Sequence, residues 1–581
     1  MKSPTPTKTK SIYGDYVGRR EFDNYQQYRT FLDKNKDCLE NEVLPTVQFL
    51  TERYHQIPDE EMSVPKLECH FDDIEVYSEV FPSPDKADHP ITIITIAHNK
   101  GIQSFGLHAY TNDTGIKNLT YHHCDNERDL LTQYFNWKHK NPCDISTGWF
   151  YCDDKKSNTR GGFDLPYIIN RTKKLFGDDT KLWKLLSPSK QASTWFTKDG
   201  IQQIYIAGVT ILDYKAIYKW YSTNNLESGK LDYVAQLEGL GGKIDYGEYG
   251  NLRNLYKQNW QLYCEYNFRD AQLVQNIDKK CGYFALIQSL ALLCKVPMAM
   301  YNSTTALIEG LMLTYYRRNN LCAPRLVGGS QEWYPAAFVK EPKKGLYNWV
   351  IDIDITSSYP TAIITLNISP ETYFGRIIGF SEKHITDYRT EKGVHDKDND
   401  DRPFYKIIVE YMQTKEFPPF YFMKNDDLRT IVFIEGAQLD AINQSLKKKL
   451  FCVAPCGSMF KNSPKGVIAI VEKLVFEKRK FQNGEKKRLY KEADKLKGKE
   501  KKDLLEKAKQ KHDLQWALKI LLNSVYGVMG VPYSRYFNKH AAEAITSTGR
   551  QTILDGQRYA NELLNNPSDE LLNILREIIE Y

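Results

Sequence analysis

Residues 67–97 read LECHFDDIEVYSEVFPSPDKADHPITIITIA, and this stretch decides how the first large domain is built. A strand-like pattern begins at Leu67 and ends at Val76, and a second apolar strand covers 91–97 after a turn rich in Pro and Asp. Strands then alternate with helical stretches to about residue 320. The sequence therefore predicts a mixed α/β domain that opens on a pair of strands.

The chain is long enough for several domains. Its 581 residues predict roughly three to five of them, and its content of 41 % hydrophobic and 26 % charged residues is typical of a globular protein. The net charge is only +6, but residues 472–511 hold 16 Lys and Arg against 8 Asp and Glu. This concentration predicts a basic helical surface that suits an anionic partner.

Membrane and secretory segments are not expected. No apolar run reaches the roughly 18 residues of a membrane span, and the N-terminal stretch MKSPTPTKTK lacks the apolar core of a signal peptide. We therefore expect no membrane partner and a place in the cytoplasm, which would be the host cytoplasm for a viral protein.

Two carboxylates lie in the first predicted strand. Asp73 and Glu75 share one face because side chains alternate along a strand, whereas Ile74 points to the core. A third acid, Asp164, follows a Gly-rich loop at the start of a helix that we expect to begin at Pro166. Taken singly, such residues are typical of surface strands and helix caps.

A fourth carboxylate and a tyrosine extend the set. Tyr266 and Asp270 are spaced i, i+4 and so share one helical face. Four carboxylates and a tyrosine suit phosphodiester hydrolysis by two Mg²⁺ ions, because hard oxygen ligands hold these ions and a phenol can orient the attacking water. The same ligands would accept Mn²⁺.

In order and spacing, the segments around Asp73, Asp164 and Tyr266 resemble the three exonuclease motifs of the family B DNA polymerases, and the stretch after the first motif resembles those of large tailed bacteriophages. The resemblance implies an RNase H-like 3′→5′ proofreading domain. In it Asp73, Glu75, Asp164 and Asp270 would hold metal and Tyr266 would orient water.

A second group of residues begins at Asp354, which ends an apolar strand predicted over 349–355. A carboxylate there can hold metal, and the following turn exposes backbone N–H groups that suit phosphate. Tyr359 precedes Pro360, which restricts its backbone and would fix the ring beside a nucleotide.

The stretch from Asp354 to Pro360 resembles polymerase motif A of the same family. The resemblance implies that Asp354, with Ile355, holds the catalytic metals and that Ser357 contacts the nucleotide. Tyr359 would reject a ribose 2′-OH.

Two long helices are predicted between Lys465 and Val528, with a turn near Gly498. Two antiparallel helices with basic faces would close over an anionic ligand. On the second helix Lys519, Asn523 and Tyr526 share one face, and Gly527 permits close approach of a flat group.

These helices resemble the fingers hairpin and motif B of family B. The resemblance implies that Arg479 and Lys519 bind the triphosphate, and that Asn523, Tyr526 and Gly527 line the nascent base pair. Asn483 stands where a relative has Lys, so whether Lys486 or Lys487 assists Arg479 stays open.

The resemblance implies an order of domains, and two of the family's parts are not recognised in this chain. We expect an N-terminal domain (1–66), an exonuclease domain (67–330), a linker with the first part of the palm (331–465), a fingers hairpin (466–528) and an incomplete palm continuation (529–581). The family's Asp-Thr-Asp motif C and its thumb are not recognised. We therefore expect a second chain that carries both and that also contacts a sliding clamp. A split gene, an interrupted gene and a fragment are equally compatible origins.

The leading hypothesis is a DNA-directed DNA polymerase piece with 3′→5′ exonuclease activity, two Mg²⁺ ions per active site, and primer-template DNA, single-stranded DNA and dNTPs as substrates. A stand-alone 3′→5′ exonuclease and a non-catalytic DNA-binding protein are the alternatives.

Overall fold

The computed structural model describes residues 6–35, 37–58, 61–62, 65–152, 162–222, 224–329, 334, 339, 341, 343–346, 354–355, 357–392, 403–424 and 430–565. The chain divides into two compact units. Unit 1 comprises 1–59, 290–296 and 303–581, and unit 2 comprises 60–289 and 297–302. The strand predicted over 349–355 lies outside the described residues except for Asp354 and Ile355.

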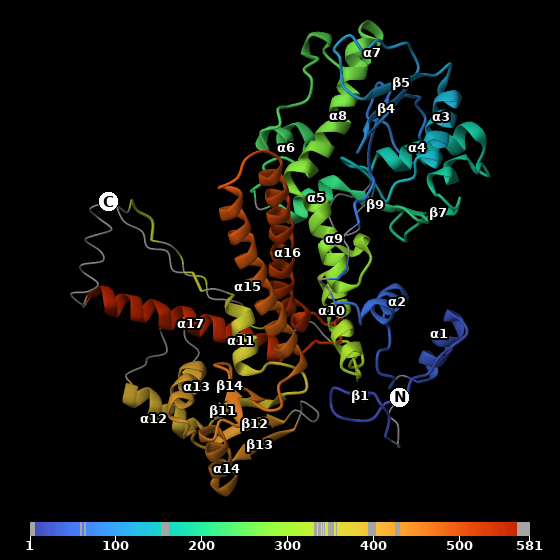
Figure 1. Ribbon diagram of the computed structural model, residues 1–581. Helices are drawn as coiled ribbons and strands as arrows, with labels where there is room; N and C mark the ends of the chain where they lie inside the picture. Colours follow the sequence, from blue (N-terminus) through green and yellow to red (C-terminus); the bar gives the residue numbers. More distant parts are fainter. Residues whose placement is uncertain are drawn as a thin grey trace. The chain divides into compact units, whose positions relative to one another are not determined.

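Unit 2 is built on a six-stranded sheet in the order β5-β4-β3-β2-β6-β9 (Figure 1). The predicted strand pair is confirmed, because β2 and β3 are antiparallel neighbours with Asp73 opposite Thr95. β4 also pairs antiparallel with β3, whereas the pairs β4–β5, β2–β6 and β6–β9 are parallel. The strands are β2 (Cys69–Val76), β3 (Ile91–His98), β4 (Gly101–Gly106), β5 (Leu119–His123), β6 (Ile145–Gly148) and β9 (Thr210–Asp213), with a separate hairpin of β7 (Ala192–Phe196) and β8 (Gln202–Ile206).

Helices cover both faces of this sheet (Figure 1). One face packs Ile74 and Ile94 against α3 and α4, and the other packs Ile93 against α7 and α8. All eight residues of β3 are buried, which explains its unbroken apolar run. The helices of unit 2 are α3 (Glu127–Lys140), α4 (Asp164–Phe176), α5 (Tyr214–Tyr221), α6 (Leu231–Leu237), α7 (Leu252–Gln258) and α8 (Trp260–Cys281), and α9 (Tyr283–Cys294) contributes residues to both units.

Unit 1 contains a five-stranded antiparallel sheet in the order β13-β12-β11-β15-β14. Arg376 of β11 ties this sheet to α17 through an ion pair with Glu543 at 2.6 Å. The strands are β11 (Tyr373–Phe380), β12 (Phe420–Lys424), β13 (Ile431–Ile434), β14 (Phe451–Val453) and β15 (Ser458–Lys461), and the short strands β1 (Lys10–Ser11) and β10 (Leu321–Cys322) pair elsewhere in the unit. The helices outside the hairpin are α1 (Tyr25–Lys34), α2 (Pro45–Tyr54), α10 (Thr304–Arg318), α11 (Ser358–Leu366), α12 (Glu382–Lys392), α13 (Pro403–Thr414), α14 (Gly436–Lys447) and α17 (Lys539–Asn565).

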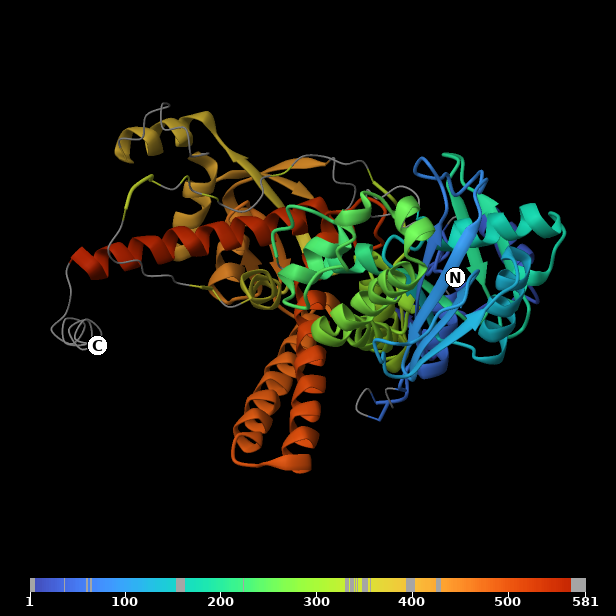
Figure 2. The same cartoon turned by 90° about the horizontal axis from the view of Figure 1, so that it is seen from above.

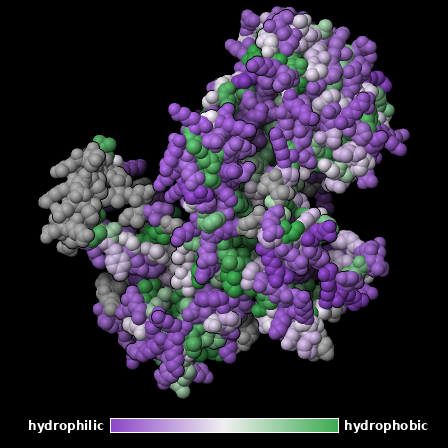
Figure 3. Space-filling view, in the orientation of Figure 1, coloured by the Kyte–Doolittle hydropathy of each residue, from purple (hydrophilic) through white to green (hydrophobic). Residues whose placement is uncertain are grey.

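The predicted helical hairpin is confirmed as α15 (Val467–Ala493) and α16 (Gly498–Gly530), which lie side by side in Figure 2. Gly498 adopts a φ of +68°, a left-handed conformation that glycine reaches without steric cost, so it opens the second helix after a tight turn. The apolar stripe of α16 is buried, including Leu518 and Leu521. Figure 3 shows mainly hydrophilic residues over the outer surface of the hairpin.

One local expectation was wrong in detail, because helix α4 begins at Asp164 rather than at Pro166. Tyr359 is helical in α11 although it precedes Pro360. Both prolines lie in a first helical turn, where the backbone N–H has no intrahelical partner and proline is therefore tolerated. Among the described residues, no helix is both long and apolar enough to cross a membrane.

Candidate active sites

Three of the predicted carboxylates converge in unit 2. Asp73 and Glu75 of β2 and Asp270 of α8 each offer an oxygen within 4.8 Å of the others. The alternation of β2 places both acids on the α8 side of the sheet, whereas Ile74 between them is 5 % exposed and belongs to the opposite core. The structure thus brings together residues that are almost 200 positions apart in the sequence.

Asp164 lies near this group but outside the converging set. It is the first residue of α4 and is buried. Its backbone neighbours are fixed, because the N–H groups of Phe163 and Leu165 donate to the carbonyls of Phe150 and Tyr151 at 2.7 and 3.1 Å. Burial, followed by the charges of Asp73 and Glu75, raises the pKa of Asp164 well above its usual range.

The carboxylates of the cluster repel one another, and burial strengthens this effect. Burial, and then repulsion from Asp270, raise the pKa of Glu75 to about 8, and burial with Asp270 and Glu75 raises the pKa of Asp73. Oδ1 of Asp270 is buried without a hydrogen-bond partner. An unpaired buried oxygen among several carboxylates suits a hard divalent cation, which would neutralise the repulsion and use that oxygen as a ligand. The residues therefore fit a metal site.

Lys243 is a residue of this site that sequence reasoning missed. Its ammonium group contacts the carboxylate of Asp270 and donates to the hydroxyl of Tyr266 at 3.0 Å. Burial lowers the pKa of Lys243, but Asp270 and Tyr266 outweigh that effect, and the net pKa is raised. The Gly241-Gly242-Lys243 sequence is a signal only in retrospect, because it marks a loop without indicating where its lysine points.

Two further polar residues hold the carboxylates in place. Asn267 donates to Oδ2 of Asp73 at 2.6 Å. On the other side of the strand, Asp72 is fully buried and pairs with Lys138 at 2.9 Å, and it also accepts from the hydroxyl of Tyr151 at 2.8 Å. This network fixes the strand segment from which Asp73 projects.

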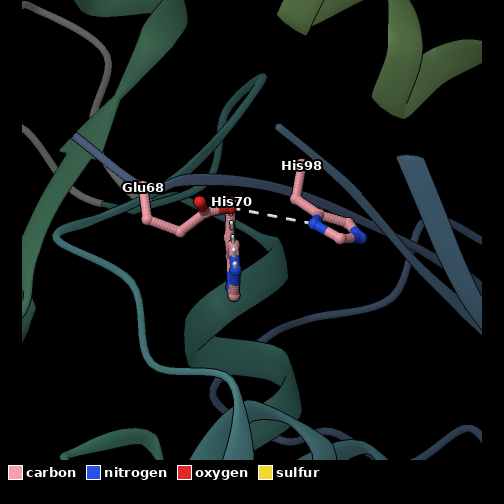
Figure 4. Close-up of side chains that lie close together, drawn as sticks. All are labelled: Glu68, His70 and His98. Atoms are coloured by element: carbon pink, nitrogen blue, oxygen red, sulfur yellow. Dashed lines mark ion pairs between the residues drawn. The ribbon is translucent and has the colours of Figure 1, made fainter. Parts of the chain in front are cut away.

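A second group of ligand-type side chains lies at the other end of β2. Figure 4 shows the carboxylate of Glu68 paired with both His70 and His98, and its Oε1 lies 3.9 Å from Nε2 of His70 and 3.7 Å from Nδ1 of His98. Nζ of Lys138 lies 3.3 Å from Nδ1 of His70. Because an ammonium group only donates, the proton of neutral His70 belongs on Nε2, the atom that a metal would need. Since both imidazoles also pack on Trp137, we read this group as structural.

Several of the predicted nucleotide-binding residues meet in unit 1. The rings of Tyr359 and Tyr526 lie 4.9 Å apart, and Tyr526 shares a hydrogen bond of 3.2 Å with the hydroxyl of Tyr334. Arg479 donates to Oγ of Ser357 at 3.2 Å. Ser357 has a φ of +53°, a strained conformation for a residue other than glycine, and such strain is commonest at binding sites.

The remaining predicted residues differ in their contacts and in their exposure. Lys519 lies over the ring of Trp516 at 5.0 Å, and Asn523 is exposed. A Cβ atom built on Gly527 would meet no atom within 4 Å, so the surface beside it is open. Asp354 is exposed and Ile355 half-buried, and Asp354 belongs to no close group of three metal-ligating side chains in the described part of the chain.

Comparison with known proteins matches two parts of the chain to one polymerase family. Residues 30–234 match the exonuclease domain of DNA polymerase family B, and residues 294–406 and 434–577 match DNA polymerase family B itself. The DNA-directed DNA polymerases of Enterobacteria phage T4 and Escherichia phage RB69 are each 28 % identical over 601 aligned positions, covering 96 % of this chain. The DNA polymerase catalytic subunit of Alcelaphine herpesvirus 1 is 26 % identical over 55 % of the chain and 32 % of its own length. The chain spans 62 % of the length of the two phage relatives.

Proposed function

The chain belongs to DNA polymerase family B, and from this premise we propose that unit 2 hydrolyses DNA from its 3′ end. The observation that carries the proposal is the convergence of Asp73, Glu75 and Asp270 around the unpaired oxygen of Asp270. When bound there, two Mg²⁺ ions would lower the pKa of a water molecule and stabilise the leaving 3′ oxygen, and Mn²⁺ would serve the same ligands.

The side chains have separate tasks in this reaction. Asp73, Glu75, Asp164 and Asp270 would bind the ions, and Asn267 keeps Asp73 in its orientation. The hydroxyl of Tyr266 accepts a hydrogen bond from Lys243 and lies beside Asp270, where it would orient the attacking water. The ammonium group of Lys243 offsets the negative charge that develops on the phosphate.

An exposed phenylalanine beside a half-buried one would position the 3′-terminal base. Phe81 is 80 % exposed, and its ring lies 5.2 Å from that of Phe163, the residue before Asp164. Bases stack on aromatic rings regardless of sequence, as an exonuclease without base preference requires.

We also propose that unit 1 binds a dNTP for template-directed transfer. Tyr359 and Tyr526 would form the wall beside the sugar and the base, with Tyr359 rejecting a 2′-OH, and Ser357 would contact the phosphates. Arg479 and Lys519 supply positive charge for the triphosphate. Asp354, with the backbone of Ile355, would bind the metal ions of this site. Asn523 and Gly527 would face the nascent base pair.

Nucleotide transfer by two metal ions needs more than one carboxylate. The 581 residues contain no Asp-Thr-Asp string. We propose that this motif and the DNA-gripping thumb come from a further polypeptide segment, either a second chain or a longer form of this one, and that the sliding clamp contacts that segment.

A 5′-labelled primer-template incubated with Mg²⁺, with and without dNTPs, tests both activities. We expect shortening of the primer without dNTPs, and extension only after the further segment is added. Shortening with no extension under any condition would favour a stand-alone exonuclease. If Asp73→Asn shortens the primer as fast as the unaltered protein, the hydrolytic site is wrongly assigned.

A further inference from the structure

We propose that Tyr77, Arg253 and Lys257 form a phosphate-binding subsite beside the carboxylate cluster of unit 2. The subsite would hold a backbone phosphate of the DNA strand, one linkage away from the bond that is cut. This inference rests on the proposed exonuclease function and adds to it a set of residues that contact substrate without touching the metal ions.

The position of Tyr77 places the subsite near the reacting bond. Tyr77 follows Glu75 by two residues, a distance of about 7 Å along an extended chain. Its ring lies 5.0 Å from that of Tyr256, which belongs to the apolar cluster on the α8 side of the sheet. This is the face that carries Asp73 and Glu75, and the spacing is comparable to that of neighbouring phosphates in an extended single strand.

The side chains of Arg253 and Lys257 both lie beside the phenol ring of Tyr77. Nε of Arg253 donates to the hydroxyl of Tyr77 at 3.2 Å, and the guanidinium carbon lies 5.6 Å from the centre of the ring. The ammonium group of Lys257 lies 6.0 Å from the same centre. Arg253 and Lys257 are spaced i, i+4 at the two ends of one turn of α7, so both reach the same side of the helix.

The positive charge of this group is only partly neutralised. Glu79 pairs with Arg253 at 2.5 Å, but its side chain is 70 % exposed and can turn away into solvent. Among the described residues, no carboxylate lies within ion-pair distance of Lys257, which is itself exposed. A net positive site that presents a guanidinium fork and an ammonium group is suited to a phosphodiester.

The base of the subsite is rigid. Tyr256, on which Tyr77 packs, contacts Trp260 at 5.5 Å and Tyr263 at 5.4 Å, and its hydroxyl shares a hydrogen bond of 2.9 Å with His108. Tyr263 in turn bonds Thr92 of the central sheet at 2.8 Å. A rigid platform holds its cations in place before the strand arrives, so little conformational entropy is lost on binding.

The test compares Arg253→Gln/Lys257→Gln with the unaltered protein on a 5′-labelled single-stranded oligonucleotide. Arg128→Gln is the control, because Arg128 also lies over an aromatic ring, that of Phe176 at 5.2 Å, but it is exposed and belongs to α3. Binding is measured in EDTA by fluorescence anisotropy over a salt series, and hydrolysis is measured in Mg²⁺. Arg253→Lys/Lys257→Arg, which keeps both charges, separates electrostatic binding from a structural role.

In hydrolysis, the double glutamine variant is expected to have a KM about 10-fold higher than that of the unaltered protein and a kcat within about 2-fold. In binding, it should reduce the slope of log K against log salt concentration by about 0.7 for each lost phosphate contact. The charge-retaining variant and Arg128→Gln should keep the slope. A methylphosphonate at the linkage 5′ of the scissile one should weaken binding by the unaltered protein and not by the glutamine variant. Unchanged KM and slope would overturn the subsite. If neither the unaltered protein nor any variant releases nucleotide, but the glutamine variant still has the smaller salt slope, the proposed exonuclease function is wrong and the phosphate-binding subsite is supported.

Discussion

The ammonium group of Lys243 donates a hydrogen bond of 3.0 Å to the hydroxyl of Tyr266 while it contacts the carboxylate of Asp270. One cation therefore fixes both the proposed water-orienting phenol and a proposed metal ligand. Because the lysine lies on a loop and the other two residues lie on α8, the contact also attaches that loop to the helix.

Replacing Lys243 by methionine should lower the rate of nucleotide release by about 100-fold, because a donor aimed at developing charge is lost and Tyr266 is no longer held. The measurement is kcat on a single-stranded oligonucleotide in excess Mg²⁺. Lys280→Met is the control, since Lys280 lies on α8 but pairs with Glu238 away from the carboxylates. Equal rates for Lys243→Met and Lys280→Met would remove Lys243 from the site.

Metal affinity should increase with pH. The pKa of Glu75 is raised to about 8, so in the metal-free protein this carboxyl is largely protonated below that pH, and a cation must displace the proton. The apparent affinity for Mn²⁺ should rise up to about 10-fold per pH unit as pH approaches 8 and should level off above it. Calorimetric titration between pH 6 and 9 measures this slope, and Glu75→Gln should flatten it. A slope that is the same in both proteins would contradict the prediction.

The raised pKa of Glu75 also makes the stability of the folded protein depend on pH. A carboxyl whose pKa is higher in the folded state than in the unfolded state binds its proton more tightly when folded, so stability falls as pH rises from about 4 towards 8. Addition of Mg²⁺ at pH 8 should therefore raise the Tm of the unaltered protein more than at pH 5.

Asp72→Asn should destabilise the protein by roughly 3–5 kcal/mol, because it leaves the charge of Lys138 buried without a partner. Denaturant unfolding monitored by circular dichroism measures the loss. In the double variant Asp72→Asn/Lys138→Met no charge remains unpaired, and most of the stability should return. If the single and double variants are equally unstable, the ion pair does not account for the effect.

Arg479→Ala should weaken dNTP binding by about 10-fold, because a guanidinium contact to phosphate is lost. Titration with a fluorescent dNTP in the presence of Ca²⁺ measures the Kd. Arg488→Ala is the matched control on the same helix, since Arg488 is exposed and pairs with Glu485 and Glu492 at 2.8 Å. Similar Kd values for both variants would mean that the triphosphate does not contact Arg479.

Sequence patterns predicted those features that depend on interactions between residues close together in the sequence. The alternation along 67–76 placed Asp73 and Glu75 on one face, and the spacing of apolar residues on α16 together with Gly498 predicted the hairpin. The convergence of Asp270 with the strand acids could be expected only from the resemblance, because no local rule relates a helix face to a strand almost 200 residues away.

Contacts between distant segments could not be read from the sequence. Lys243 is 27 residues from Asp270, and Asp72 is 66 residues from Lys138. Asp72 and Asp73 are chemically identical neighbours, yet one is neutralised by a buried lysine and the other faces the cluster. Only the burial pattern of β2 separates their roles, and that pattern depends on which helices cover each face of the sheet.

The most direct test of the central claim is release of the 3′-terminal nucleotide from a 3′-labelled single strand by the unaltered protein and by Asp270→Asn in Mg²⁺. Removal of a carboxylate at the centre of the cluster should lower the rate by at least about 100-fold, with DNA binding in EDTA unchanged. Nucleotide release by Asp270→Asn at the rate of the unaltered protein would contradict the account of this site.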